Sequence, residues 1–348
     1  MGGDDTFWGK ESVVAMLMRE QRASGRVDPA LITFSPSRLG AVLAQEGFEV
    51  DTLAAGPSHG FDRALKELGR RLRAGPVAVI HSHGYRANIV AKTLRLLGRA
   101  RGVRIVSTCH GWVESTPALR LYNGLDRWST PLSDVTTVPD SRMLSALSPV
   151  GRRAHVPNGV ADLPAAKRGV APERPGAFVA GTLGRVSEPK GVLDVLAAAE
   201  GFPDSAVVFA LAGVGDLVPR VREAGDNVRY LGYFEYPERY LETLDVYVQA
   251  SHSEGLSLAL LEAMRAGKAI VATDVGATRD AVTHRESALI VPPHDAPALR
   301  SAVLELRNDP ELRLRLGLNA RKRFEAGFRI SHQHQRYLEL YRAGGTNE

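Results

Sequence analysis

The sequence has one cysteine, Cys109, which leaves no partner for an internal disulfide and favours a reducing compartment. No apolar run approaches the roughly 18 residues that a membrane-spanning helix needs. No basic, then apolar, then small-residue signal opens the chain. We therefore expect a cytoplasmic protein, and a length of 348 residues favours two domains.

Several motifs that mark common enzyme classes are also missing. No G-x-G-x-x-G opens a helix after a first strand, which disfavours a NAD-dependent oxidoreductase. The sequence has no Walker phosphate loop, no clustered cysteines, no H-E-x-x-H and no G-x-S-x-G elbow. No Asp-x-Asp pair is present to hold a divalent ion. We expect no metal and no other cofactor, so that protein groups would neutralise any bound diphosphate.

Acidic residues are under-represented in the first half of the chain. Residues 1–160 hold 21 Lys and Arg against 14 Asp and Glu, whereas residues 161–348 hold 23 against 25. A basic half suits a phosphate-rich partner or an anionic membrane surface, and scattered solvated charges are the alternative. Nucleic acid is not expected, because no basic stripe with interleaved aromatic residues is present.

Short β-rich runs alternate with helix-period segments along the chain, which indicates two α/β halves with parallel, doubly wound sheets. The expected strands of the first half are Leu31–Phe34, Phe48–Leu53, Val77–His81, Arg104–His110 and Val135–Val138. Those of the second half are Ala177–Ala180, Ala206–Ala210, Val228–Leu231, Val246–Ala250, Ala269–Thr273 and Ala288–Val291. The clearest expected helices are Ser12–Ala23, Ala87–Leu97, Val192–Ala199, Leu258–Ala266 and Ala296–Arg307.

This alternation predicts domains at residues 1–160 and 177–323. Residues 161–176 contain three prolines and little apolar patterning, so they are expected to form the linker. Residues 324–348 are expected to form a closing helix, because Phe324, Phe328, Tyr337, Leu338 and Tyr341 follow a helical pattern.

Polar residues with chemical potential follow three of the expected strands. They are His81-Ser82-His83-Gly84, Cys109-His110-Gly111 and Ser251-His252-Ser253-Glu254-Gly255. Ligands bind at the carboxyl ends of strands in such sheets, near helix N-termini. The placement of these residues is therefore a first indication of function.

Two glutamates, Glu254 and Glu262, are the most informative pair in the sequence. Eight helical steps of about 1.5 Å would separate them by roughly 12 Å, about the reach from the sugar of a nucleotide sugar to its ribose. Carboxylates accept hydrogen bonds from vicinal hydroxyls, and a helix N-terminus between them favours phosphate. The alternative is a capped surface helix with two solvated glutamates.

A basic turn follows the first strand of the second half, from Gly184 to Gly191. Arg185 and Lys190 in this turn are placed to neutralise a diphosphate and the charge that builds on a leaving nucleotide. A solvated basic turn is the alternative.

Together these segments resemble the family-4 glycosyltransferases, which are retaining enzymes of the GT-B fold. The resemblance covers nearly the whole chain, with its motifs in order and at family-like spacing. They are Val156-Pro157-Asn158-Gly159-Val160, the Arg185, Lys190, Gly191 turn, the Glu-x7-Glu pair Glu254 and Glu262, Lys268–Thr273 with Gly276, and Ala288–Pro293. The resemblance implies two Rossmann-like domains facing a central cleft, with the closing helix crossing back to the first domain.

The resemblance also implies residue roles. Glu254 would lie by the donor sugar, Glu262 would hold the ribose hydroxyls, and Arg185 and Lys190 would grip the diphosphate. His110 matches a histidine that faces the donor sugar, although a structural histidine is the alternative. Further donor-binding residues implied are Gly9 in the Trp8-Gly9-Lys10-Glu11 loop, His83, Gly184, Gly255, Leu256, Ser257 and Leu258.

The implied reaction transfers a hexosyl group from a nucleotide-diphosphate sugar to a glycan or lipid-linked acceptor, in cell-surface polysaccharide or lipopolysaccharide synthesis. A GT-B-fold sugar-nucleotide epimerase and a catalytically degenerate scaffold are the alternatives. The second is favoured by one departure from the family, since no strand precedes Gly2-Gly3 and the first strand is expected to be missing. Ala161 also precedes Asp162 where the family has Asp or Asn, and Gly276-Ala277 stands for Gly-Gly.

One further segment bears on the acceptor. Phe61, Leu65, Leu68 and Leu72 fall on one helical face, with five basic residues elsewhere on the same segment. Such a helix can lie on an anionic bilayer, which would place the enzyme peripherally on the inner face of the cell membrane. The alternative is that its leucines pack on the sheet.

Overall fold

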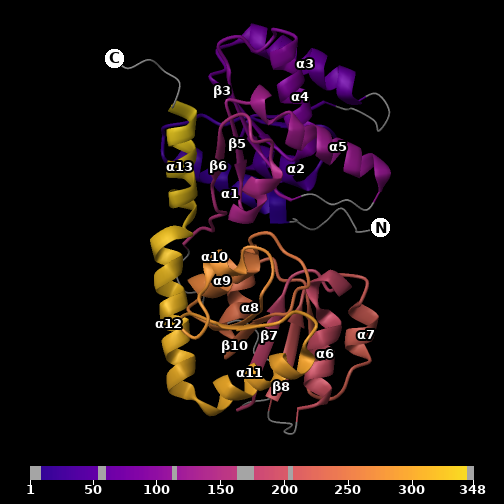
Figure 1. Cartoon of the computed structure of the whole chain (residues 1–348), viewed down its shortest axis with the longest axis vertical. Coiled ribbons are helices and arrows are strands. Elements are labelled where there is room, and N and C mark those ends of the chain that lie inside the picture. Colours follow the sequence, from indigo (N-terminus) through magenta and orange to yellow (C-terminus); the bar gives the residue numbers. More distant parts are fainter. Residues whose placement is uncertain (1–8, 54–59, 112–115, 163–175, 203–206, 343–348) are drawn as a thin grey trace. The chain divides into compact units, whose positions relative to one another are not determined.

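The computed structural model describes residues 9–53, 60–111, 116–162, 176–202 and 207–342 (Figure 1). It divides the chain into two compact units, one formed by Met1–Asn158 with Ile330–Glu348 and the other by Gly159–Arg329. The expectation of a missing first strand falls on residues outside this range. The same holds for Trp8 and for most of the predicted linker.

The first unit contains a four-stranded parallel sheet in the order β3-β4-β5-β6 and a separate parallel pair, β1-β2. Its strands are β1 (Leu31–Thr33), β2 (Val50–Thr52), β3 (Val79–His83), β4 (Arg104–Thr108), β5 (Val135–Val138) and β6 (Arg153–His155). Its helices are α1 (Gly9–Ala23), α2 (Arg38–Gln45), α3 (Gly60–Ala74), α4 (Tyr85–Leu96), α5 (Pro117–Trp128) and α13 (Ile330–Arg342), with 3-10 turns η1 (Thr130–Leu132) and η2 (Ser141–Ala146).

Helix α3 packs on the sheet of this unit. Its Ala64 and Leu65 are buried in a core with residues of α4 and β4, and Leu68 and Leu72 pack against the same core. Of its apolar face only Phe61 is exposed, at 43%. The packing interpretation of this segment is therefore confirmed.

The second unit contains a six-stranded parallel sheet in the order β12-β11-β10-β7-β8-β9. The strands are β7 (Phe178–Leu183), β8 (Val207–Ala212), β9 (Val228–Gly232), β10 (Val246–Gln249), β11 (Ala269–Thr273) and β12 (Leu289–Val291). The helices are α6 (Val192–Glu200), α7 (Val218–Arg222), α8 (Pro237–Glu242), α9 (Leu258–Arg265), α10 (Thr278–Ala281), α11 (Ala296–Asn308) and α12 (Pro310–Gly327), with η3 (Glu188–Lys190). Strands β8, β10 and β11 are buried on both faces, as their apolar runs predict.

The predicted closing helix is divided in two. Helix α12 ends at Gly327 and α13 begins at Ile330, because the Phe328 carbonyl accepts from Val160 N–H and Arg329 pairs with Asp162 at 2.9 Å. Helix α13 packs against α1 and belongs to the first unit, so the change of unit lies at Ile330 and not at Phe324. Among the described helices, none combines the length and the hydropathy that crossing a membrane requires.

Candidate active site

The order of the strands in the second unit reverses next to β7. Strands β8 and β9 extend the sheet on one side of β7, while β10, β11 and β12 extend it on the other. Parallel pairing sets Val246 beside Ala180 and Tyr247 beside Gly181, so the carboxyl ends of β7 and β10 lie side by side. In doubly wound sheets, ligands bind in the crevice at such a reversal.

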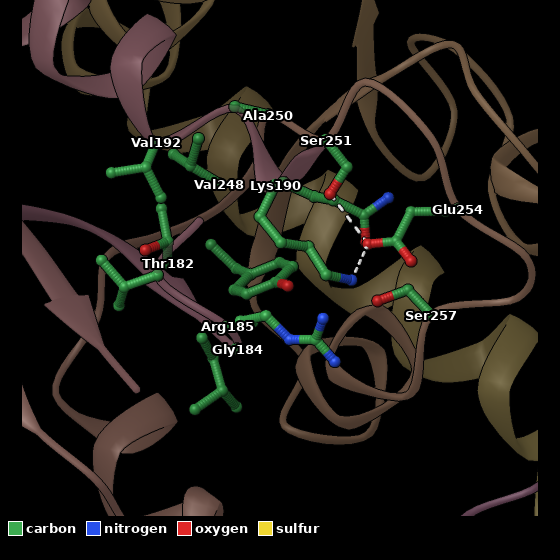
Figure 2. A pocket seen from close by; sticks show the side chains of 14 residues that line it. Thr182, Gly184, Arg185, Lys190, Val192, Val248, Ala250, Ser251, Glu254 and Ser257 are labelled. Carbon is green, nitrogen blue, oxygen red and sulfur yellow. Dashed lines mark hydrogen bonds and ion pairs between the residues drawn. The ribbon is translucent and has the colours of Figure 1, made fainter. Parts of the chain in front are cut away.

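A small cavity, open to solvent, lies at this point (Figure 2). It is lined by the end of β7 and the turn after it, by the end of β10 and the loop after it, and by the residue before α9. The lining residues are Thr182, Leu183, Gly184, Arg185, Val186, Lys190, Val192, Tyr247, Val248, Gln249, Ala250, Ser251, Glu254 and Ser257. The cavity thus gathers the basic turn and the first glutamate that the sequence pointed to.

Glu254 is held by two donors in the cavity. Lys190 Nζ forms an ion pair with Glu254 Oε1, and Ser251 Oγ donates to the same oxygen at 2.8 Å. Figure 2 shows Arg185 and Ser257 reaching into the same space. The side chain of Glu254 is 11% exposed and that of Lys190 34%. An acid and two cations therefore line one small space, in which Glu254 is largely shielded from solvent while Arg185 is exposed.

Two glycines bring the backbones of these segments close. Gly191, at φ +66°, follows Lys190, and a Cβ there would collide with the carbonyl oxygen of Ala250 at the end of β10. Gly276, at φ +54°, lies against the carbonyl of Glu254 in the same way. Both positions therefore need glycine, for its positive φ and for the close approach.

Glu262 lies in the middle of α9 and does not line the cavity. Because α9 begins only at Leu258, the residues between Glu254 and Ser257 are not helical, and the continuous helix assumed for the predicted distance is absent. The pKa of Glu262 is raised to about 7, mainly by burial. The charge of Arg265 opposes this rise, and that of Glu238 adds to it. Burial raises the pKa of the Tyr247 phenol in the cavity, and the negative charges of Glu254 and Glu262 raise it further.

The raised pKa of Glu262 predicts a pH-dependent stability. The folded state binds an extra proton between the ordinary value of 4.5 and about 7, so stability should fall as pH rises through this window and stay level above it. Glu262→Gln should therefore be more stable than the wild type at pH 8, by up to about 3 kcal/mol, but not at pH 4.5. Urea unfolding at both pH values measures this. Exposed Glu223→Gln is the control, and an equal gain at both pH values would contradict the prediction.

Three histidines gather in the first unit. His81 and His83 lie two residues apart in β3 and so share a face of the sheet, with ring centroids 4.1 Å apart. His83 Nδ1 and His110 Nε2 share a hydrogen bond of 2.9 Å, and His81 is bonded to Tyr341 at 2.7 Å and to Thr108 at 2.8 Å. Burial lowers the pKa of all three imidazoles. The pKa of His83 falls to about 3, because the positive charge of Lys10 lowers it further. The imidazoles are therefore neutral at physiological pH.

The structure corrects the position of two of these histidines. His81 and His83 lie within β3, not after it, because the strand runs two residues further than predicted and ends before Gly84. Lys10 Nζ comes close to Gly84, and Gly9 is the first residue of α1. Lys10, His83 and His110 are thus neighbours in the first unit. The contact between His81 and Tyr341 was not predicted. The period of two in a strand could have indicated that His81 and His83 share a face.

The other predicted donor-binding residues surround the cavity of the second unit without all lining it. Gly184 and Ser257 line the cavity, and Ser257 caps α9 by accepting from Leu260 N–H. Gly255, Leu256 and Leu258 lie in the loop and first turn beside it, and Leu256 is buried. Their assigned roles stay predictions.

Two family models match the chain in succession. "Glycosyl transferase 4-like domain" matches residues 9–159 and "Glycosyl transferases group 1" matches residues 165–323. Together they take in both halves, in the order of the two units. The chain belongs to the family-4 glycosyltransferases. It is a transferase enzyme, as the sequence predicted.

Curated relatives of this glycosyltransferase are transferases and synthases. It is 30% identical to O-antigen chain mannosyltransferase C of Escherichia coli over 44% of this chain and 43% of that protein. It is 28% identical to the phosphatidyl-myo-inositol mannosyltransferase of Mycolicibacterium smegmatis over 71% of this chain and 67% of that one. The chain thus spans 43% and 67% of the length of these two relatives.

Solved structures confirm the GT-B fold. HepE of Anabaena, crystallised with UDP, superposes with a TM-score of 0.80 at 17% identity and covers 97% of this chain and 96% of its own. The same protein with UDP-glucose gives a TM-score of 0.78 at 18% identity, over 97% of each chain. At such identities the likeness shows the fold.

Proposed function

We propose that this glycosyltransferase moves a hexosyl group from a nucleotide-diphosphate sugar to a glycan or lipid-linked acceptor, with retention of configuration and without a metal at the diphosphate. The observation that carries the proposal is the convergence of Arg185, Lys190 and Glu254 on one cavity at the strand reversal of the second unit. The named relatives support the acceptor class, since they act in O-antigen and phosphatidylinositol glycan synthesis by their names. An epimerase finds no such support.

In the proposed reaction, Arg185 and Lys190 bind the diphosphate oxygens. The bond from the anomeric carbon to the leaving phosphate breaks through an oxocarbenium-like state, and negative charge grows on the phosphate that these two cations face. Fixed cations in a partly desolvated site stabilise such charge more than water does. Front-face attack, in which the leaving phosphate takes the acceptor's proton, gives retention and needs no protein nucleophile. Glu254 then positions and stabilises the sugar.

A donor panel tests the proposal. Ligands that bind only the folded state stabilise it by about 2.7 kcal/mol at a hundred times Kd, so one of the UDP-, GDP- or ADP-sugars should raise the melting temperature while the matching free sugar does not. The shift should persist in EDTA if protein groups alone hold the diphosphate. Product analysis of the stabilising donor with an acceptor should give transfer with retained anomeric configuration. An epimerised sugar nucleotide formed without acceptor, or no stabilisation by any donor, would contradict the proposal.

A peripheral contact with an anionic membrane is part of the proposal, but on α5 and not on the predicted α3. Leu121, Leu125 and Trp128 recur on one face of α5 and are 63%, 49% and 82% exposed. Helix α4 packs beside it and ends at Leu96; Leu96 and Leu97, the next residue, are 66% and 53% exposed. An exposed apolar face with tryptophan and nearby arginines is typical of helices that lie in a bilayer interface.

Vesicle pelleting measures this contact. The wild type should pellet with vesicles containing anionic lipid at low salt, and the double variant Leu125→Glu with Trp128→Glu should remain in the supernatant. Leu318→Glu on α12, at a position 54% exposed, is the matched control and should pellet like the wild type. Equal pelleting of all three proteins would remove the contact from α5, and pelleting of none of them would remove the membrane contact altogether.

A further inference from the structure

A second group of polar side chains lies in the second unit, outside the cavity lining. Asp194 belongs to the first turn of α6, His252 to the loop after β10, and His294 to the loop after β12. His252 Nε2 donates to Asp194 Oδ2 at 2.8 Å, and the two imidazole centroids are 3.6 Å apart. One ligand atom from each residue lies within 4.8 Å of the other two.

The backbone of His294 is unusual. Its φ is +59°, and among the described residues only Arg285 shares a positive φ without being glycine. A side chain in this conformation costs about 1–2 kcal/mol relative to the right-handed region. Glycine would avoid that cost, but it would remove the ring that lies over His252.

We propose that Asp194, His252 and His294 bind a divalent transition-metal ion of the zinc class, with solvent in the remaining position. Imidazole nitrogen with one carboxylate oxygen suits zinc and similar ions, whereas magnesium and calcium take oxygen ligands. Tetrahedral ligands at about 2.0–2.1 Å from zinc stand roughly 3.3 Å apart, so small side-chain rotations from the present spacing complete the site.

The position of this metal site differs from that of a diphosphate metal. None of its three residues lines the cavity beside Lys190. The site instead joins three separate segments at the carboxyl edge of the sheet. The backbone N–H of His252 donates at 2.9 Å to the carbonyl of Pro189, the residue directly before Lys190. A bound ion would therefore fasten the loops that flank the basic turn, and it would stabilise the folded chain.

Metal titration of the whole EDTA-treated chain tests the proposal. One equivalent of Zn²⁺ should bind and raise the melting temperature, Co²⁺ should give the visible absorption of a tetrahedral complex, and Mg²⁺ should do neither. His294→Gly should weaken Zn²⁺ affinity by more than roughly 100-fold, since loss of an outer partner alone costs 10–100-fold. Because glycine suits φ +59°, this variant should fold at least as stably as the wild type without metal.

Two further variants sharpen the test. Asp194→Asn can keep a hydrogen bond to His252 and should lose Zn²⁺ affinity with its charge. His155→Gln in the first unit is the control, because its amide can still donate to the Pro139 carbonyl, and it should bind Zn²⁺ as the wild type does. Equal Zn²⁺ affinity in His294→Gly and the wild type would overturn the proposal. Binding of sugar nucleotides is measured separately from binding of Zn²⁺. A negative result in the donor panel therefore does not affect the metal proposal, and a negative Zn²⁺ titration does not affect the proposed function.

Discussion

Glu254→Gln is expected to lower the turnover of sugar transfer by about 10²–10³-fold while the protein folds normally. The carboxylate faces two donors in the cavity, Lys190 and Ser251, and its negative charge would stabilise the oxocarbenium-like sugar. Glutamine has the same shape and can still accept from Ser251, but it carries no charge. The loss should therefore fall on kcat more than on the KM for donor.

Steady-state rates with the donor selected by the panel measure this loss. Glu188→Gln is the control, because Glu188 is an exposed acid on the same turn as Lys190. It should turn over like the wild type. Both variants should keep the wild-type melting temperature within a few degrees, and near-normal turnover in Glu254→Gln would exclude the proposed role.

Lys190→Ala is expected to lower kcat by a similar factor, about 10²–10³-fold, because it removes a positive charge where Glu254→Gln removes a negative one. The ammonium would neutralise the phosphate that leaves, and its loss leaves Arg185 as the second cation in the cavity. It also removes the ion-pair partner of Glu254, whose side chain is 11% exposed. A partner removed from a partly buried pair leaves an uncompensated charge, so this variant should also be less stable than the wild type.

Lys190→Arg separates charge from geometry. It should recover part of the lost turnover, because a guanidinium can bind phosphate oxygens although it is larger and planar. Lys66→Ala in α3 is the control for loss of a lysine far along the sequence, with unchanged kcat expected. If Lys190→Ala raised only the KM for donor and left kcat as it was, the cation would serve uniform binding and not charge development.

The periodic parts of the fold could be read from the sequence. The apolar runs of β8, β10 and β11 predicted buried parallel strands, because strands covered on both faces need continuous apolar residues. Strand β6 was missed, since Arg153–His155 is short and carries no apolar pattern. The break between α12 and α13 was missed as well, because it depends on Val160 and Asp162, which are distant in sequence.

Local chemistry was likewise readable by itself. The glycine-bounded turn with Arg185 and Lys190, and the acid at Glu254 after a strand, are features of short segments. Their types and spacing predicted phosphate and sugar binding, and that assignment stays a prediction. The resemblance that they carry predicted the glycosyltransferase family, and the two family models confirm the family.

Only the tertiary structure decided which of these segments meet. The strand order that sets β10 beside β7 brings together Lys190 and Glu254, 64 residues apart, and no local pattern specifies that order. Burial, which depends on every neighbour, raises the pKa of Glu262 and keeps the stacked histidines of the first unit neutral. The group of Asp194, His252 and His294 arises the same way, from the first turn of α6 and the loops after β10 and β12.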